Sequence, residues 1–149
     1  TYLLPFISAD AIGNNGVVAS SKQVASDIGI DILKNGGNAI DAAVAVAFAL
    51  SVSHPSAGNL GGGGFMVINF PDGHSTTIDF REVAPLNSHK DMYLDTDGNV
   101  ISGLSTLSAL ASGVPGSVYG LGYAHEKYGN LSWMISCYHQ LFWRNLDLN

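Results

Sequence analysis

The sequence predicts an α/β (α+β) fold in which helices pack on a sheet that contains a β-hairpin. Residues 39–52 form an apolar run of helical length, and residues 65–80 contain two β-type runs separated by a Pro-Asp-Gly turn. The composition also fits, because 149 residues with 46% hydrophobic and 12% charged side chains can bury a core. One globular domain is therefore expected.

The first expected elements are a short strand and an amphipathic helix. Val17 to Ala19 is the strand candidate, and Ser20 or Ser21 can cap the helix by accepting a bond from a free first-turn N–H. Apolar residues then recur at spacings of three and four, which predicts one stripe of Val24, Ala25, Ile28, Ile32 and Leu33. Gly36-Gly37 is expected to end this helix.

A second helix is predicted over residues 39–52, with Asn38 as its cap and Asp41 in its first turn. Apart from Asp41 and Ser51, this helix is apolar on every face. It is shorter than the roughly 20 apolar residues that cross a membrane. It also closes at His54-Pro55, so a buried core helix is expected. Capping accounts for Asp41, and a catalytic acid is its alternative role.

The glycine run Gly61 to Gly64 leads into the predicted hairpin. Such a run is expected where the backbone turns with positive φ or packs where no Cβ fits. The hairpin pairs Phe65 to Phe70 with His74 to Phe80. A phosphate-binding loop needs Gly-Lys-Ser/Thr or G-x-G-x-x-G before a helix, and neither pattern is present. A nucleotide site is therefore not expected.

The chain after Pro85 is expected to be looser, with a short helix over residues 88–95 and a turn over residues 96–99. Pro115 stands where another helix can begin. That helix is predicted over residues 117–128, with a stripe of Val118, Leu121, Gly122 and His125. His125 itself is expected at the surface or at a boundary of the core.

Charge and cysteine content exclude several classes of function. The formal net charge is −6, and the six Lys and Arg residues are scattered, so no nucleic-acid partner is expected. The single cysteine, Cys137, cannot form an internal disulfide. The five histidines show no metal-type spacing with carboxylates or cysteine, so neither a metal nor another cofactor is expected.

Three segments, KNGGNAIDAAVA, HPSAGNLGGGGF and FREVAP, follow one another in this order. Together they resemble the γ-glutamyltranspeptidase (glutathione hydrolase) family, in the opening part of its large subunit. The resemblance covers residues 16–133 and implies a partial Ntn-hydrolase αββα sandwich, cut from a precursor that cleaves itself. A chain this short would lack the second sheet, so some apolar surface is expected to stay uncovered.

The resemblance also implies the chemistry of the family. A threonine at the start of the small subunit attacks a γ-glutamyl amide, such as that of glutathione, and forms an acyl-enzyme. The glutamyl group then passes to water or to an amino-acid or peptide acceptor. The resemblance therefore places no catalytic residue in this chain, and it implies the rest of the large subunit and the small subunit as partners.

Arg81 is the one functional residue that the resemblance assigns, because it matches the arginine of the family's R-E-x-A-P motif. That arginine holds the α-carboxylate of the substrate, a task suited to a planar guanidinium that stays charged. The alternative is a surface arginine paired with Glu82 or Asp79.

The two ends of the chain stand outside the resemblance. Residues 1–15 are read as the remnant of a signal peptide, with an A-x-A-like site at Ala9 to Ala11, or as a stray apolar end. The first reading implies a periplasmic or secreted protein. Residues 134–149 are read as an out-of-frame ending, or as an amphipathic helix with one face formed by Met134, Cys137, Tyr138, Leu141 and Phe142.

Two hypotheses of different class follow. The chain is either part of a γ-glutamyl-transferring enzyme or a non-catalytic remnant of that family, and in both cases it is expected to be inactive alone. A related β-lactam (cephalosporin) acylase is a third possibility. Comparing γ-glutamyl amides with cephalosporin side-chain amides as substrates of a full-length relative would separate the first and third hypotheses.

Overall fold

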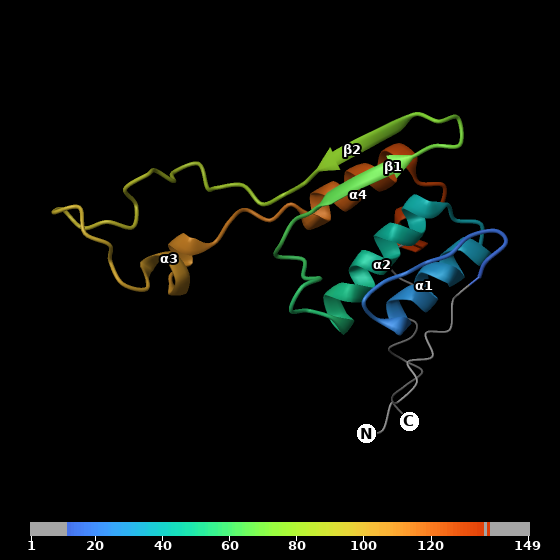
Figure 1. Ribbon diagram of the computed structural model, residues 1–149, viewed down its shortest axis with the longest axis horizontal. Coiled ribbons are helices and arrows are strands. Elements are labelled where there is room, and N and C mark those ends of the chain that lie inside the picture. Colours follow the sequence, from blue (N-terminus) through green and yellow to red (C-terminus); the bar gives the residue numbers. More distant parts are fainter. Residues whose placement is uncertain (1–11, 136, 138–149) are drawn as a thin grey trace, which may run out of the picture.

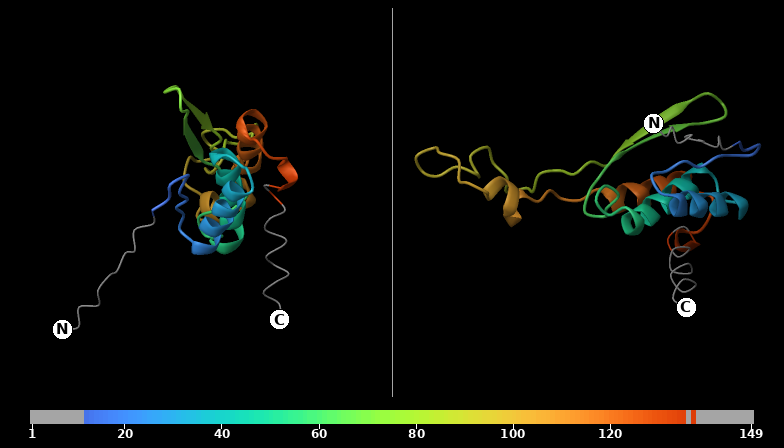
Figure 2. Two further views of the ribbon diagram at one scale, coloured as in Figure 1. Left: turned by 90° about the vertical axis from the view of Figure 1, so that its right-hand side faces the viewer. Right: turned by 60° about the horizontal axis from the view of Figure 1, so that its bottom comes forward.

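The computed structural model describes residues 12–135 and 137. Three helices and a β-hairpin form the body, and an arm that carries a short helix projects from it (Figures 1 and 2). The elements are α1 (Gln23–Lys34), α2 (Ala39–Ser53), β1 (Phe65–Asn69), β2 (Ser75–Asp79), α3 (Leu104–Leu107), a 3-10 turn (Ala109–Ala111) and α4 (Ser117–Tyr128).

Helix α2 is the central element, as predicted, because both hydrophobic clusters use it. On one side it packs against α1 through Ala25, Ile28, Ile32, Ala42, Ala45 and Ala49. On the other side it meets the hairpin and α4 through Ile40, Val44, Ile68, Leu121 and Ala124. The hairpin therefore lies over α4 and α2, while α1 lies on the opposite side of α2 (Figure 1). The many alanines of α2 permit this close approach on two faces.

Helix α1 begins at Gln23, one residue later than a cap at Ser21 would place its start. Lys22 is the N-cap residue and makes no side-chain capping bond, so the predicted cap at Ser20 or Ser21 is wrong. The Ser20 hydroxyl instead donates to the carbonyl oxygen of Lys22 at 2.8 Å and lies 2.8 Å from Ser26 Oγ. A hydroxyl engaged by these two partners is not placed to accept from the first turn of the helix.

Val17 to Ala19 do not form a strand, which corrects a second prediction. A strand needs a neighbour to accept its backbone hydrogen bonds, and none pairs with these residues in the described part of the chain. The segment runs along the helices instead. A Cβ at Gly29 of α1 would lie 2.8 Å from Val18 Cγ1 and 2.7 Å from Val46 Cγ2. Gly29 thus lets this segment and α2 approach α1 closely.

The hairpin has the predicted pairing. Strands β1 and β2 are antiparallel, with Phe65 opposite Asp79 and Asn69 opposite Ser75, and Gly73 has a φ of 90° in the turn. Met66 and Ile68 face the core, whereas Phe65 and Val67 are 64% and 69% exposed. Apolar surface therefore stays uncovered on the outer face of β1, as expected from the resemblance.

The arm differs from its prediction. Residues 88–95 form successive turns rather than a helix, and Leu94 and Val100 pair as an isolated bridge around the predicted turn. Inside that turn, Asp95 Oδ1 accepts hydrogen bonds from the backbone N–H of Asp97 and of Asn99. These bonds, with that from Asn99 the strongest, lower the pKa of Asp95. Within the predicted helix, Met92 N donates to His89 O and Leu94 N donates to Asp91 O, so three-residue turn bonds replace the bonds of a continuous helix.

No helix in residues 12–135 is long and apolar enough to cross a membrane. The expected processing site at Ala9 to Ala11 lies outside the described residues, and so do residues 138–149 of the tail. Burial raises the pKa of the half-buried Cys137 thiol, which disfavours the reactive thiolate.

The α1 stripe gives the first testable prediction. Ile32 is fully buried, whereas Val24, assigned to the same stripe, is 46% exposed. Ile32→Ala is expected to lower the free energy of unfolding by about 2–5 kcal/mol, because it leaves a cavity between α1 and α2. Val24→Ala, the control, should lower it by less than about 1 kcal/mol. Urea unfolding followed by circular dichroism measures both, and equal losses would contradict this packing.

Candidate functional site

Arg81 lies at the point where the hairpin leaves the body and enters the arm. Its backbone N–H donates to Asp79 Oδ1 at 3.0 Å, so the Asp79 carboxylate engages the main chain rather than the guanidinium. The side chain is exposed. Across residues 12–135, its guanidinium forms no ion pair with a carboxylate, and the alternative pairs with Glu82 and Asp79 are absent.

The backbone on both sides of Arg81 is held by hydrogen bonds. Before it, Phe80 N donates to Gly64 O at 3.0 Å, and Gly64 N donates to Phe80 O at 3.4 Å. After it, Val83 N donates to Val114 O at 3.2 Å, and Val114 N donates to Val83 O at 2.8 Å. These two bonds join the outgoing and returning segments of the arm where it leaves the body. Arg81 thus presents an exposed side chain from a main chain that hydrogen bonds hold on both sides.

The glycine run lies directly against this main chain. A Cβ at Gly63 would lie 2.5 Å from Phe80 O, 2.8 Å from Arg81 Cα and 2.7 Å from Glu82 N. No residue from Gly61 to Gly64 has a positive φ, so close approach, which is tightest at Gly63 and Gly64, and not a left-handed turn, explains the glycines there. Of the two reasons predicted for these glycines, only the second is correct.

Helix α4 joins the same site through its first turn. The carbonyl oxygen of Gly62 accepts from Gly116 N at 2.9 Å and from Ser117 N at 3.0 Å. These N–H groups have no partner within their own helix, and a carbonyl satisfies them. Helix α4 begins at Ser117 and ends before Gly129, as predicted. The glycine run, the end of the hairpin and the start of α4 therefore meet around Arg81.

A groove of about 370 Å³ begins beside Arg81, between the outgoing and returning segments of the arm. Glu82 and Val83 line one side, and residues 110–113 line the other. Tyr93 spans it, and its hydroxyl donates to the carbonyl oxygen of Leu110 at 3.1 Å. The sequence did not reveal this groove, because its sides are separated by nearly thirty residues that carry no periodic pattern.

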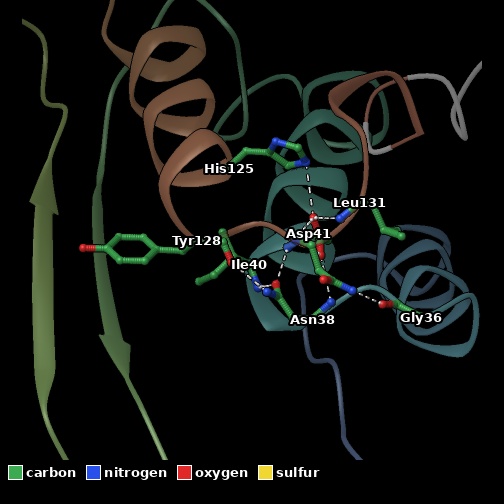
Figure 3. Close-up of polar contacts among 8 residues, drawn as sticks. Gly36, Asn38, Ile40, Asp41, His125, Tyr128 and Leu131 are labelled. Carbon is green, nitrogen blue, oxygen red and sulfur yellow. Dashed lines mark hydrogen bonds and ion pairs between the residues drawn. The ribbon is translucent and has the colours of Figure 1, made fainter.

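Asp41 lies away from Arg81, in a buried polar cluster at the other end of α4 (Figure 3). Its carboxylate accepts from Asn38 N at 2.8 Å, and Asn38 Oδ1 accepts in return from Asp41 N, which completes a capping box. The same carboxylate accepts from the backbone N–H of Asn130 at 3.0 Å and of Leu131 at 3.2 Å. The predicted capping role is confirmed.

His125 belongs to the same cluster, so its expected place at the surface or boundary is wrong. It is 7% exposed, and its Nε2 lies 3.2 Å from Oδ1 of Asp41, which is 0% exposed. The Trp133 ring packs edge-on against it, with 5.2 Å between ring centroids. His125 thus fastens α4 to the start of α2. Its place in the helical stripe was the signal that pointed inward.

Sequence comparison places these features in a known family. The family model described as Gamma-glutamyltranspeptidase matches residues 25–136, which is more than half of the chain. The chain belongs to the γ-glutamyltranspeptidase family. It is 60% identical over 115 residues to a glutathione hydrolase proenzyme of Pseudomonas sp. (strain A14), and 57% identical over 116 residues to one of Escherichia coli (strain K12).

These alignments cover 77% and 78% of this chain but only 20% of each relative. The chain thus spans about a fifth of the length of the curated γ-glutamyltranspeptidase relatives that it matches. The match includes the segment that carries Arg81 and the one that carries His125, since both lie within residues 25–136.

Solved γ-glutamyltranspeptidase structures share the fold. That of Helicobacter pylori aligns with a TM-score of 0.82 and 48% identity, over 86% of this chain and 37% of the solved one. That of Pseudomonas nitroreducens complexed with L-DON aligns with a TM-score of 0.78 and 48% identity, over 84% and 37%. The predicted mixed α/β class and the partial Ntn-hydrolase fold are confirmed.

The buried cluster gives the second testable prediction. Asp41→Ala leaves several buried N–H groups and His125 without their carboxylate, so the free energy of unfolding should fall by about 3–5 kcal/mol. Asp27→Ala removes an exposed carboxylate that accepts only from Gln23 Nε2 in the described structure, and it should change stability by less than about 0.5 kcal/mol. Chemical denaturation compares the two variants. Similar small losses would show that the cluster does not hold the helices together.

Proposed function

We propose that this chain supplies the opening part of the large subunit of a γ-glutamyl-transferring enzyme. The enzyme would transfer the γ-glutamyl group of glutathione, or of a related γ-glutamyl amide, to water or to an amino-acid or peptide acceptor. Membership of the family supports this proposal, as do the names of the relatives, glutathione hydrolase proenzymes. The acyl-enzyme would form on a threonine outside this chain.

The exposure of the Arg81 side chain, together with the restraint of its main chain, supports this proposal most directly. Its guanidinium is exposed and forms no ion pair within the described residues, while its main chain is fixed on both sides. A guanidinium offers two parallel N–H groups to a carboxylate, and these charge-assisted bonds fix orientation as well as charge. The α-carboxylate of a γ-glutamyl donor is the group that this fork would grip.

Gripping the α-carboxylate would serve the reaction by positioning. The γ-carbonyl carbon lies a fixed number of bonds from the α-carboxylate, so holding one end of the donor limits where the other end can lie. Such restraint replaces an encounter in solution by a prearranged attack on the amide. Arg81 would therefore contribute binding and orientation, and it would take no part in proton transfer.

The remaining parts of the enzyme are proposed as partners of this chain. The exposed apolar face formed by Phe65 and Val67 on β1 offers a surface for the rest of the large subunit and the small subunit. Export to the periplasm or the medium is likewise a proposal, and it rests on the apolar amino end of the sequence.

The third prediction tests Arg81 in a full-length enzyme that carries this FREVAP segment. Arg81→Ala removes both bonds to the α-carboxylate and leaves that charge unpaired, so kcat/KM should fall by an amount equivalent to about 2–5 kcal/mol. Arg81→Lys should recover only part of the loss, because a point charge cannot reproduce the fork. Steady-state hydrolysis of a γ-glutamyl anilide measures both.

Two controls isolate the role of Arg81. Lys22→Ala removes an exposed cation whose side chain caps nothing, and it should leave kcat/KM within about twofold. A donor without the α-carboxylate should already be poor and should lose little more in Arg81→Ala. If that variant kept kcat/KM for the normal donor within about threefold, or roughly 0.6 kcal/mol, Arg81 would not bind the substrate.

The fourth prediction concerns the 149-residue chain by itself. Removing the nucleophile from an enzyme abolishes the function of the whole catalytic unit, and binding residues alone leave only a small residual rate. The purified chain is therefore expected neither to cleave itself nor to turn over a γ-glutamyl anilide. Mass spectrometry and an anilide assay test this. Turnover that is lost on denaturation and absent from a mock preparation would place a nucleophile within this chain.

A further inference from the structure

Phe80, the residue before Arg81, lies in a notch made by three glycines. A Cβ at Gly64 would lie 3.0 Å from Phe80 Cε2 on the ring. A Cβ at Gly120 would overlap Cβ and Cγ of Phe80, and one at Gly116 would overlap its carbonyl oxygen. Gly116 and Gly120 stand one turn apart at the start of α4, where Gly120 N donates to Gly116 O at 2.8 Å. The notch thus clamps both the side chain and the main chain of Phe80.

Neither Gly116 nor Gly120 is explained by backbone conformation. Both have negative φ, which other residues adopt freely, and glycine inside a helix is less favourable than alanine. What distinguishes them is the close approach of Phe80. Gly122, on the same helix, has no such neighbour, since a Cβ there would meet only Trp133 Cη2 at 3.9 Å.

The notch acts on Arg81 because a single peptide bond joins the two residues. Phe80 is partly buried against α4, whereas the Arg81 side chain is exposed. A change in the seat of Phe80 therefore shifts the base of the guanidinium. A displacement of about 1 Å in a positioning group can reduce a rate by about 100-fold.

We infer that Phe80, seated against Gly116 and Gly120, is the positioning residue that sets where the Arg81 fork meets the α-carboxylate of the donor. This inference rests on the proposed function of Arg81 and adds the part of the fold that determines its position. Phe80 and the two glycines act through Arg81 and touch no reacting atom.

The fifth prediction compares two substitutions of the same kind in the full-length enzyme. Gly120→Ala forces Phe80 to move, so kcat/KM for the γ-glutamyl donor should fall by about 10- to 100-fold, mainly through a higher KM. Gly122→Ala makes the same chemical change on the same helix without a clash, and it should stay within about twofold. An equal effect of the two substitutions would overturn the inference.

A double-mutant cycle with Arg81→Ala separates positioning from general damage. Once the guanidinium is gone, Gly120→Ala should reduce kcat/KM by no more than about threefold further, because its effect passes through Arg81. The same small effect is expected with a donor that lacks the α-carboxylate. A loss of equal size with and without Arg81 would mean that Gly120 serves only the packing of α4.

Phe80→Leu, which keeps an apolar side chain but loses the ring, enters the same cycle if Gly120→Ala does not fold. The cycle also distinguishes the two proposals. If Arg81→Ala is harmless, the proposed function fails and this inference fails with it. If Arg81→Ala is harmful but its effect adds independently to that of Gly120→Ala or Phe80→Leu, only the positioning role of Phe80 is overturned.

Discussion

The carboxylate of Asp41 is the contact on which the arrangement of the helices depends. It is fully buried and accepts hydrogen bonds from the backbone at the start of α2 and from the backbone after α4. Its Oδ1 also lies 3.2 Å from Nε2 of His125. A buried carboxylate is unfavourable unless hydrogen-bond donors surround it, so these groups are obliged to converge. One side chain thereby fixes the end of α4 to the start of α2, which is also the helix that divides the two hydrophobic clusters.

The opposite end of α4 packs against the residues on either side of Arg81. Its first-turn N–H groups bind the carbonyl oxygen of Gly62, and its Gly116 and Gly120 receive Phe80. Because a helix is stiff, the burial of His125 at one end orients the seat of Phe80 at the other end. Arg81 then projects from a main chain that the glycine run, α4 and the Val83–Val114 bridge all restrain. A main chain held by hydrogen bonds, with an exposed guanidinium that forms no ion pair within the described residues, suits the capture of an anion.

What could be predicted from the sequence was the part determined by local pattern. The apolar run of α2 with its Asn38 cap, the hairpin with its turn, and the limits of α4 follow from periodicity, capping and turn residues. The errors arose where specific contacts override the periodic pattern. Ser20 bonds to Ser26 instead of capping, Val17 to Ala19 lack a neighbouring strand in the described residues, and His125 is drawn inward by Asp41. The notch around Phe80 also combines residues that are far apart in the sequence, so no local pattern predicts it.

The position of a bound donor is the most direct test of the role proposed for Arg81. A crystal structure of the full-length enzyme carrying this FREVAP segment, with glutamate bound, would show which group meets the Arg81 guanidinium. We expect both oxygens of the α-carboxylate to lie within about 2.7–2.9 Å of two guanidinium nitrogens, with Phe80 still seated against Gly120. Glutamate bound with its α-carboxylate elsewhere, while Arg81 faced solvent or paired with Asp79 or Glu82, would contradict this role.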